Sequence, residues 1–148
     1  MQLDGTVTIE APRERVWAFL TDPHKVGQCA PGLESLEVVE AGQKFEAVVS
    51  VGFGSMKARF TADIEWVELD EPERAKMKAR GKAPGSTADA TSEMKLTAMS
   101  DSETELAWEA DVSIQGTMAS LASRLMGSVT NRLTGEFFDC VKKHIEAE

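Results

Sequence analysis

The sequence has 148 residues, of which 42% are hydrophobic and 28% are charged, and its formal net charge is −9. This length predicts a single domain, residues 1–148, that is large enough to enclose a hydrophobic core. The acidic balance excludes proteins that bind nucleic acid or anionic lipid through a surplus of Lys and Arg, because both of those partners are negatively charged.

The cysteine spacing and the hydropathy pattern indicate the cellular compartment in which the protein is expected. The N-terminal stretch lacks the basic and then apolar run of a signal peptide, and no segment reaches the roughly 18 consecutive apolar residues of a membrane span. Cys29 and Cys140 lie far apart in the sequence, in a spacing typical neither of a disulfide framework nor of a zinc site. We therefore expect a cytoplasmic protein with no disulfide, no metal site and no cofactor.

The first elements are a strand and two short helices. Residues 3–9 alternate apolar and polar side chains, which predicts a half-buried strand. Residues 11–22 have proline in the first turn and apolar side chains at helical spacing, and Asp-Pro ends this helix. A short helical segment follows through Val26, and Pro31-Gly32 ends it.

The remaining chain predicts a sheet and one long helix. From Leu36 to Gln115 the apolar residues recur with a period of two and are separated by short turn signals, which predicts about six antiparallel strands. From about Ala119 to Ile145 apolar residues recur every three or four positions, which predicts a helix with one apolar stripe. The fold class is therefore α+β, a curved antiparallel sheet of about seven strands wrapped around the C-terminal helix.

The inward face of the predicted sheet is unusually rich in small side chains. A tightly packed sheet would carry mostly Val, Ile and Leu here, because protein interiors approach crystal-like density. The small residues are therefore consistent with an unfilled, apolar cavity or with a helix that approaches the sheet closely. The pattern alone leaves both open. The residues are Ala47, Ala58, Ala62, Ala79, Ala88, Ala90, Ser92 and Ala110.

Cys29 is the side chain with the most obvious chemical potential. An activated thiol needs a base or a cation beside it, and the sequence places neither His24 nor His144 against the sulfur. A cysteine packed under the sheet is the favoured interpretation. No catalytic residue is assigned.

A basic stripe, Arg74, Lys76, Lys78, Arg80 and Lys82, is predicted on the outer face of one strand. It is consistent with a docking patch for an acidic partner. Cross-strand ion pairing with acidic residues of the neighbouring strands is the favoured interpretation. Those residues are Asp63, Glu65, Asp89 and Glu93.

Several short motifs resemble those of a known family. The pattern L-x-G, A-P, V-W, D-P, C-x-P-G and E-x-L-E occurs at Leu3, Gly5, Ala11, Pro12, Val16, Trp17, Asp22, Pro23, Cys29, Pro31, Gly32, Glu34, Leu36 and Glu37. A glycine-bracketed hairpin with K-x-R-F follows, and the last helix carries Leu121, Ser123, Arg124, Leu125, Phe137 and Phe138. In these motifs the chain resembles the CoxG family of carbon monoxide dehydrogenase subunits.

The resemblance implies the START-like, helix-grip superfold (SRPBCC, polyketide cyclase-like) and favours a cavity over a filled core. It also implies an accessory role beside a molybdenum-containing carbon monoxide dehydrogenase or a related hydroxylase. Some relatives carry a C-terminal tail that holds them at the membrane. The sequence ends at Glu148, directly after the predicted helix, so we expect at most peripheral membrane association.

The predicted function is a non-catalytic accessory protein that binds an apolar ligand: a lipid, a fatty acid or an isoprenoid quinone. The cavity walls are expected at Phe45, Val49, Phe53, Phe60, Met94, Trp108, Leu125, Met126 and Val129, and a gate at Cys29, Pro31, Gly32 and Leu33. Two alternatives remain. One is a cyclase or hydrolase of the same superfold that uses Cys29 or a polar cavity residue, and the other is an assembly factor that acts through its surface.

Overall fold

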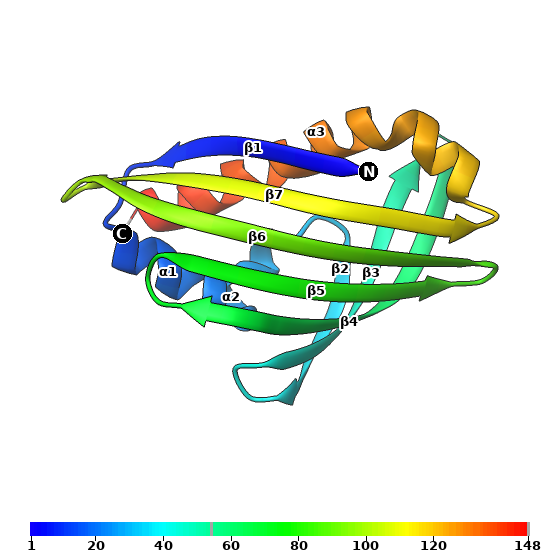
Figure 1. The fold of residues 1–148 in the computed structure, drawn as a ribbon, viewed down its shortest axis with the longest axis horizontal. Helices are drawn as coiled ribbons and strands as arrows, with labels where there is room; N and C mark the ends of the chain where they lie inside the picture. Colours follow the sequence, from blue (N-terminus) through cyan, green and yellow to red (C-terminus); the bar gives the residue numbers. More distant parts are fainter. Residues whose placement is uncertain (54, 148) are drawn as a thin grey trace.

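The computed structural model describes residues 1–53 and 55–147, with Phe53 described by its backbone alone. The order of elements confirms the predicted fold class (Figure 1). The elements are β1 (Gln2–Ile9), α1 (Arg13–Thr21), α2 (Pro23–Val26), a 3-10 turn η1 (Gly27–Cys29), β2 (Leu33–Glu40), β3 (Lys44–Phe53), β4 (Met56–Asp70), β5 (Arg74–Ala83), β6 (Ser86–Ser100), β7 (Glu103–Gly116) and α3 (Ala119–Glu146).

The strands form one antiparallel sheet in the order β1-β7-β6-β5-β4-β3-β2. Each strand from β2 to β7 pairs with its neighbour in sequence, and β1 pairs with β7 from Gln2↔Asp111 to Ile9↔Thr104. Helix α3 contacts β1 and β7 at one side of the sheet and β3 near the other. The sheet is therefore curved around α3, as Figure 1 shows.

The break between α1 and α2 follows from the Asp-Pro pair seen in the sequence. The side chain of Asp22 accepts hydrogen bonds from the backbone N–H groups of His24 (2.9 Å) and Lys25 (3.4 Å) and so caps α2. Pro23 occupies the first turn of α2, where its missing N–H carries no penalty. This local geometry turns the chain toward η1, which contacts α3, and then into β2.

The apolar interior divides into two clusters along α3. The first, which we call the C-terminal cluster, packs α1 and the end of α3 against the sheet and includes Ile9, Val16, Leu106, Val141 and Ile145, all at most 1% exposed. The second, the N-terminal cluster, packs the beginning of α3 against β4 and contains Ala58, Phe60, Met118, Ala122, Met126 and Val129. Among the described residues, no helix is both long and apolar enough to cross a membrane.

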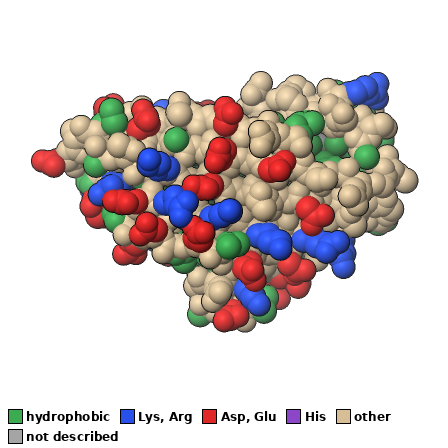
Figure 2. All heavy atoms as spheres, viewed as in Figure 1, with side chains coloured by type: hydrophobic (Ala, Val, Ile, Leu, Met, Phe, Trp, Pro, Cys, Tyr) green, Lys and Arg blue, Asp and Glu red, His purple; other side chains and the backbone are tan. Residues whose placement is uncertain are grey.

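The outer face of the sheet carries interspersed basic and acidic side chains (Figure 2). Arg74 pairs with Glu68 and with Glu93 (3.2 Å), and Arg80 pairs with Asp89 (3.5 Å). The hydrogen bond to Glu93 and the charge of Glu68 raise the pKa of Arg74, which stays charged. The predicted cross-strand partners lie in register, as Asp63↔Arg80, Glu65↔Lys78, Lys76↔Glu93 and Arg80↔Asp89. Ion pairing thus accounts for both arginines of the stripe.

Candidate ligand-binding cavity

A cavity of about 460 Å³ lies between the sheet and the C-terminal half of α3. One wall comes from α1, α2 and the segment that leads into β2, the opposite wall from the inner faces of β3 to β7, and the cover from α3. The lining residues are Leu20, Thr21, Pro23, Val26, Gly27, Ala30, Pro31, Leu33, Leu36, Phe45, Ala47, Val49, Ile64, Trp66, Ala75, Met77, Ser92, Met94, Leu106, Trp108, Leu133, Thr134, Phe137 and Phe138.

The lining is almost entirely apolar. Among the described lining residues, only Thr21, Ser92 and Thr134 carry a hydroxyl, Trp66 and Trp108 carry an indole N–H, and none is charged. An ion buried here without a partner would lose its hydration without compensation. The chemistry of the wall therefore fits an apolar molecule with at most a few hydrogen-bonding groups.

Both interpretations of the small inward residues hold, each under a different part of α3. Ala47 and Ser92 line the cavity, where α3 stands away from the sheet. Ala58 of β4 belongs to the N-terminal cluster together with Ala122 of α3, which is 2% exposed, so the interior is filled there. The helix therefore fills the interior at its beginning, leaves it open between Leu133 and Phe138, and closes it again where Val141 and Ile145 are buried in the C-terminal cluster.

The predicted wall residues separate in the same way. Phe45, Val49, Met94 and Trp108 lie in the cavity lining. Phe60, Met126 and Val129 are instead buried in the N-terminal cluster, and Leu125 packs against it. This placement differs from the expectation because those residues share the inward face with the cavity but lie under the other half of α3. Phe53 falls outside the residues whose side chains are described.

Sequence reasoning missed several lining residues. Alternation marks Trp66 and Ile64 as inward-facing, but nothing in the sequence places them at the cavity rather than in packed core. Phe137 and Phe138 of α3 also line it, with their rings 5.0 Å apart. The sequence signal for this part of α3 is the pair of adjacent aromatic residues, which interrupts an otherwise regular apolar stripe.

The predicted gate segment is the part of the wall between η1 and β2. Pro31 and Leu33 line the cavity, whereas Cys29 is 4% exposed and belongs to the C-terminal cluster. Gly32 has φ +78°, and a Cβ on it would overlap the carbonyl oxygen of Ser50. Its own carbonyl accepts a hydrogen bond from the Ser50 N–H at 2.9 Å. Glycine is thus required for the wall to lie against β3.

The substitution Gly32→Ala is expected to lower the free energy of unfolding by about 4 kcal/mol or more, in the upper range for point mutants. The overlap with Ser50 adds to the left-handed strain. Gly42→Ala is the matched control, because Gly42 has φ +72° but nothing within 4 Å of an added Cβ. That variant should lose only about 1 to 2 kcal/mol. Urea unfolding measures both, and equal losses would contradict the packing described here.

Trp108 owes its position to a second glycine. It pairs across the sheet with Gly5 of β1. A Cβ on Gly5 would come within 2.9 Å of the Trp108 Nε1 atom. The glycine of the L-x-G motif therefore leaves room for an indole that forms part of the cavity wall.

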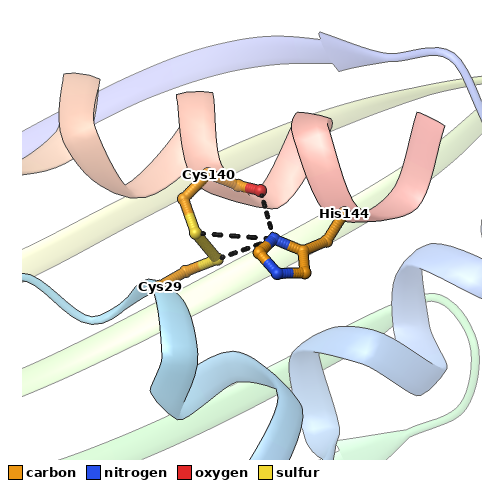
Figure 3. A group of neighbouring side chains, drawn as sticks. All are labelled: Cys29, Cys140 and His144. Atoms are coloured by element: carbon orange, nitrogen blue, oxygen red, sulfur yellow. Dashed lines mark hydrogen bonds between the residues drawn. A yellow bond between two sulfur atoms is a disulfide. The ribbon is translucent and has the colours of Figure 1, made fainter. Parts of the chain in front are cut away.

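Cys29 and Cys140 form a disulfide, with their Cα atoms 5.4 Å apart (Figure 3). The expectation of no disulfide is therefore wrong in this structure. Sequence distance carries no information on this point, because the α2–η1 segment folds back beneath α3. The sequence places neither histidine against the sulfur, whereas the structure brings His144 Nδ1 to 3.8 Å from Cys29 Sγ.

The chain matches solved structures over almost its full length. A conserved protein from Geobacillus kaustophilus is 26% identical with a TM-score of 0.91, covering 99% of this chain and 96% of its own. The Zhui aromatase/cyclase from Streptomyces sp. R1128 is 19% identical with a TM-score of 0.76, covering 99% and 93%. A START superfamily protein from Mycobacterium smegmatis is 12% identical with a TM-score of 0.72, covering 99% and 97%. The latter two likenesses establish the START-like fold alone.

No curated protein sequence matches the chain significantly. The family model for the CoxG subunit of carbon monoxide dehydrogenase matches residues 5–146, which includes every element that contributes to the cavity. The chain therefore belongs to the CoxG family and has the START-like fold expected from its motifs.

Proposed function

We propose that this protein is a non-catalytic accessory protein that binds an apolar small molecule in the cavity under α3. The cavity itself is the observation that carries the proposal. Its volume of about 460 Å³ falls within the range of small-molecule sites, and its described wall contains no charged side chain. Filling such a space with apolar groups gains roughly 0.8 kcal/mol for each methylene removed from water.

The ligand class that fits this wall is a lipid, a fatty acid or an isoprenoid quinone. Each combines a long apolar part with one or a few oxygen atoms that accept hydrogen bonds. The hydroxyl of Ser92 and the indole groups of Trp66 and Trp108 provide donors within the lining, whereas the Thr134 hydroxyl already donates to the backbone oxygen of Thr130 at 2.8 Å. A charged carboxylate is best accommodated when it remains at the cavity mouth, in contact with water.

The composition of the wall is also the reason for a non-catalytic role. General acid–base catalysis needs a titratable side chain within hydrogen-bond reach of the substrate. The described lining residues include no acid, no histidine and no thiol. Cys29, the nucleophile of the alternative enzyme hypothesis, is in the C-terminal cluster and is bonded to Cys140.

The proposed partner is a carbon monoxide dehydrogenase or a related molybdenum hydroxylase. The proposed location is the cytoplasm, where thiol reductants would keep Cys29 and Cys140 as free thiols. The name of the family supports the partner. In this role the protein would carry an apolar ligand to or from the redox enzyme. The cavity would shield the ligand from water while it is carried.

Tryptophan fluorescence tests the proposed ligand class. Trp66 and Trp108 line the cavity, whereas Trp17 donates a hydrogen bond to Glu71 at 3.1 Å and lies outside the lining. Decylubiquinone should quench the emission in a saturable way, and palmitic acid should displace the quinone. Trp108→Phe should reduce the quenching, and Trp17→Phe should leave most of it. Quenching that neither saturates nor depends on Trp108 would contradict the proposal.

A further inference from the structure

We propose that Cys29, Cys140 and His144 form a binding site for a thiophilic metal ion such as Zn²⁺ when the disulfide is reduced. The three donor atoms, two Sγ and one Nδ1, all lie within 4.8 Å of one another. Thiolate and imidazole are the ligands that Zn²⁺ prefers in proteins. This site lies beside the cavity lining, and its existence does not depend on the proposed ligand.

The distances between the donor atoms already match most of a tetrahedral site. Tetrahedral Zn²⁺ with ordinary bond lengths places sulfur and nitrogen ligands about 3.6 Å apart and two sulfurs about 3.8 Å apart. His144 Nδ1 is 3.8 Å from Cys29 Sγ and 3.6 Å from Cys140 Sγ. Only the separation of the two sulfurs must increase, and breaking the S–S bond allows this.

The neighbours of His144 hold its ring toward the sulfurs. Its ring centroid lies 5.9 Å from that of Phe19, and Nδ1 lies 3.0 Å from the backbone oxygen of Cys140 (Figure 3). In the disulfide form Nδ1 is protonated and its N–H donates a hydrogen bond to that oxygen. Metal binding requires the other tautomer, with the proton on Nε2, which frees the Nδ1 lone pair for the ion.

The conversion balances with a dithiol as reductant. One thiolate of the reductant attacks a cystine sulfur and forms a mixed disulfide, and its second thiolate then releases the protein. Two electrons pass to the cystine, the reductant becomes a disulfide, and its two protons remain on Cys29 and Cys140. Zn²⁺ then displaces both thiol protons to solvent as it binds. A water molecule would complete the coordination.

The site connects two parts of the cavity enclosure. Cys29 ends η1, directly before the lining residues Ala30 and Pro31, and Cys140 follows the lining residues Phe137 and Phe138 on α3. Disulfide and metal are therefore two alternative links between the same segments. His144 is exposed, so the ion can reach the site without passing through the interior.

The test uses the full chain in both redox states. We expect the protein reduced with dithiothreitol and desalted without oxygen to bind one Zn²⁺ per chain by elemental analysis after equilibrium dialysis. The disulfide form should bind less than a tenth as much. Co²⁺ added to the reduced protein should produce a thiolate-to-cobalt charge-transfer band. If the reduced protein retains no more Zn²⁺ than the disulfide form, the proposal is wrong.

His144→Ala and His24→Ala form a matched pair, because the sequence contains only these two histidines and both are exposed. His144→Ala should weaken Zn²⁺ binding to the reduced protein by at least about tenfold. A tenfold loss of metal affinity is the lower end of what is typical even when the residue removed only hydrogen-bonds a metal ligand. His24→Ala should leave the affinity unchanged. Equal affinity of His144→Ala and the parent would overturn the three-ligand site. Circular dichroism of the reduced protein establishes that both variants are compared in the folded state.

Discussion

Replacing Ala47 with Phe is expected to weaken the binding of an apolar ligand by more than about a hundredfold. Ala47 is 1% exposed, and its side chain belongs to the cavity lining on β3. A phenyl ring there takes the space of at least about four ligand methylenes, each worth about 0.8 kcal/mol when buried. Their loss amounts to about 3 kcal/mol, and every 1.4 kcal/mol is a factor of ten in affinity.

The same variant distinguishes a cavity from a filled core by its stability. In a packed interior the added ring would cost about 1 to 3 kcal/mol through overpacking. In an open cavity it gains buried apolar surface, so the free energy of unfolding should be unchanged or higher. Glu46→Phe is the control, because Glu46 is the exposed neighbour on the same strand and points to the other face. It should leave ligand affinity unchanged. A destabilised Ala47→Phe variant with normal affinity would contradict the account.

Phe60→Ala is expected to lower the free energy of unfolding by about 3 to 5 kcal/mol and the Tm by about 10 °C. Phe60 is 7% exposed in the N-terminal cluster, and its ring lies against Gly81, whose added Cβ would be 3.4 Å from Phe60 Cδ1. The ring is packed core rather than cavity wall, so ligand affinity in the folded protein should change by less than about threefold, or 0.6 kcal/mol.

Phe45→Ala is the matched comparison for this prediction. Phe45 is 6% exposed, close to the value for Phe60, but it belongs to the cavity lining. Its truncation should lower the affinity for the ligand by at least about tenfold, because the contact it offers the ligand is lost. Thermal unfolding gives the stability of both variants, and ligand titration gives their affinities. If Phe60→Ala reduced affinity as much as Phe45→Ala, the separation of the two regions along α3 would be wrong.

The fold could be predicted from the sequence because the patterns that indicate it are local and repeated. Period-two alternation from β2 to β7, short turns and the long apolar stripe of α3 each point to the same layer arrangement. The strand boundaries differ little, with β2 beginning at Leu33 rather than at Leu36.

The position of the cavity along α3 was not accessible in the same way. Alternation assigns Phe45 and Phe60 to the same inward face, and it contains no information on how far α3 stands from the sheet at each point. Phe45 lies at the cavity, whereas Phe60 is buried in the same cluster as Ala122 and Met126. That difference depends on how the curved sheet and α3 fit together, which is a property of the whole assembly rather than of any one segment.

The disulfide is a second feature that local sequence patterns do not predict. The pairing of Cys29 with Cys140 needs the complete sheet to bring η1 beneath the end of α3, and it spans 111 positions of sequence. Their separation in sequence carries no information on pairing, whereas the fold brings their Cα atoms to 5.4 Å, within the range that a disulfide requires.

Native mass spectrometry of the purified protein, followed by extraction with organic solvent, tests the central claim most directly. The account predicts a fraction of molecules with one apolar molecule of lipid, fatty acid or quinone mass attached, and the same compound in the extract. Ala47→Phe, purified in parallel, should lack it. A protein that carries no such molecule and does not take up added quinone, fatty acid or lipid would contradict the claim that the cavity under α3 is a ligand site.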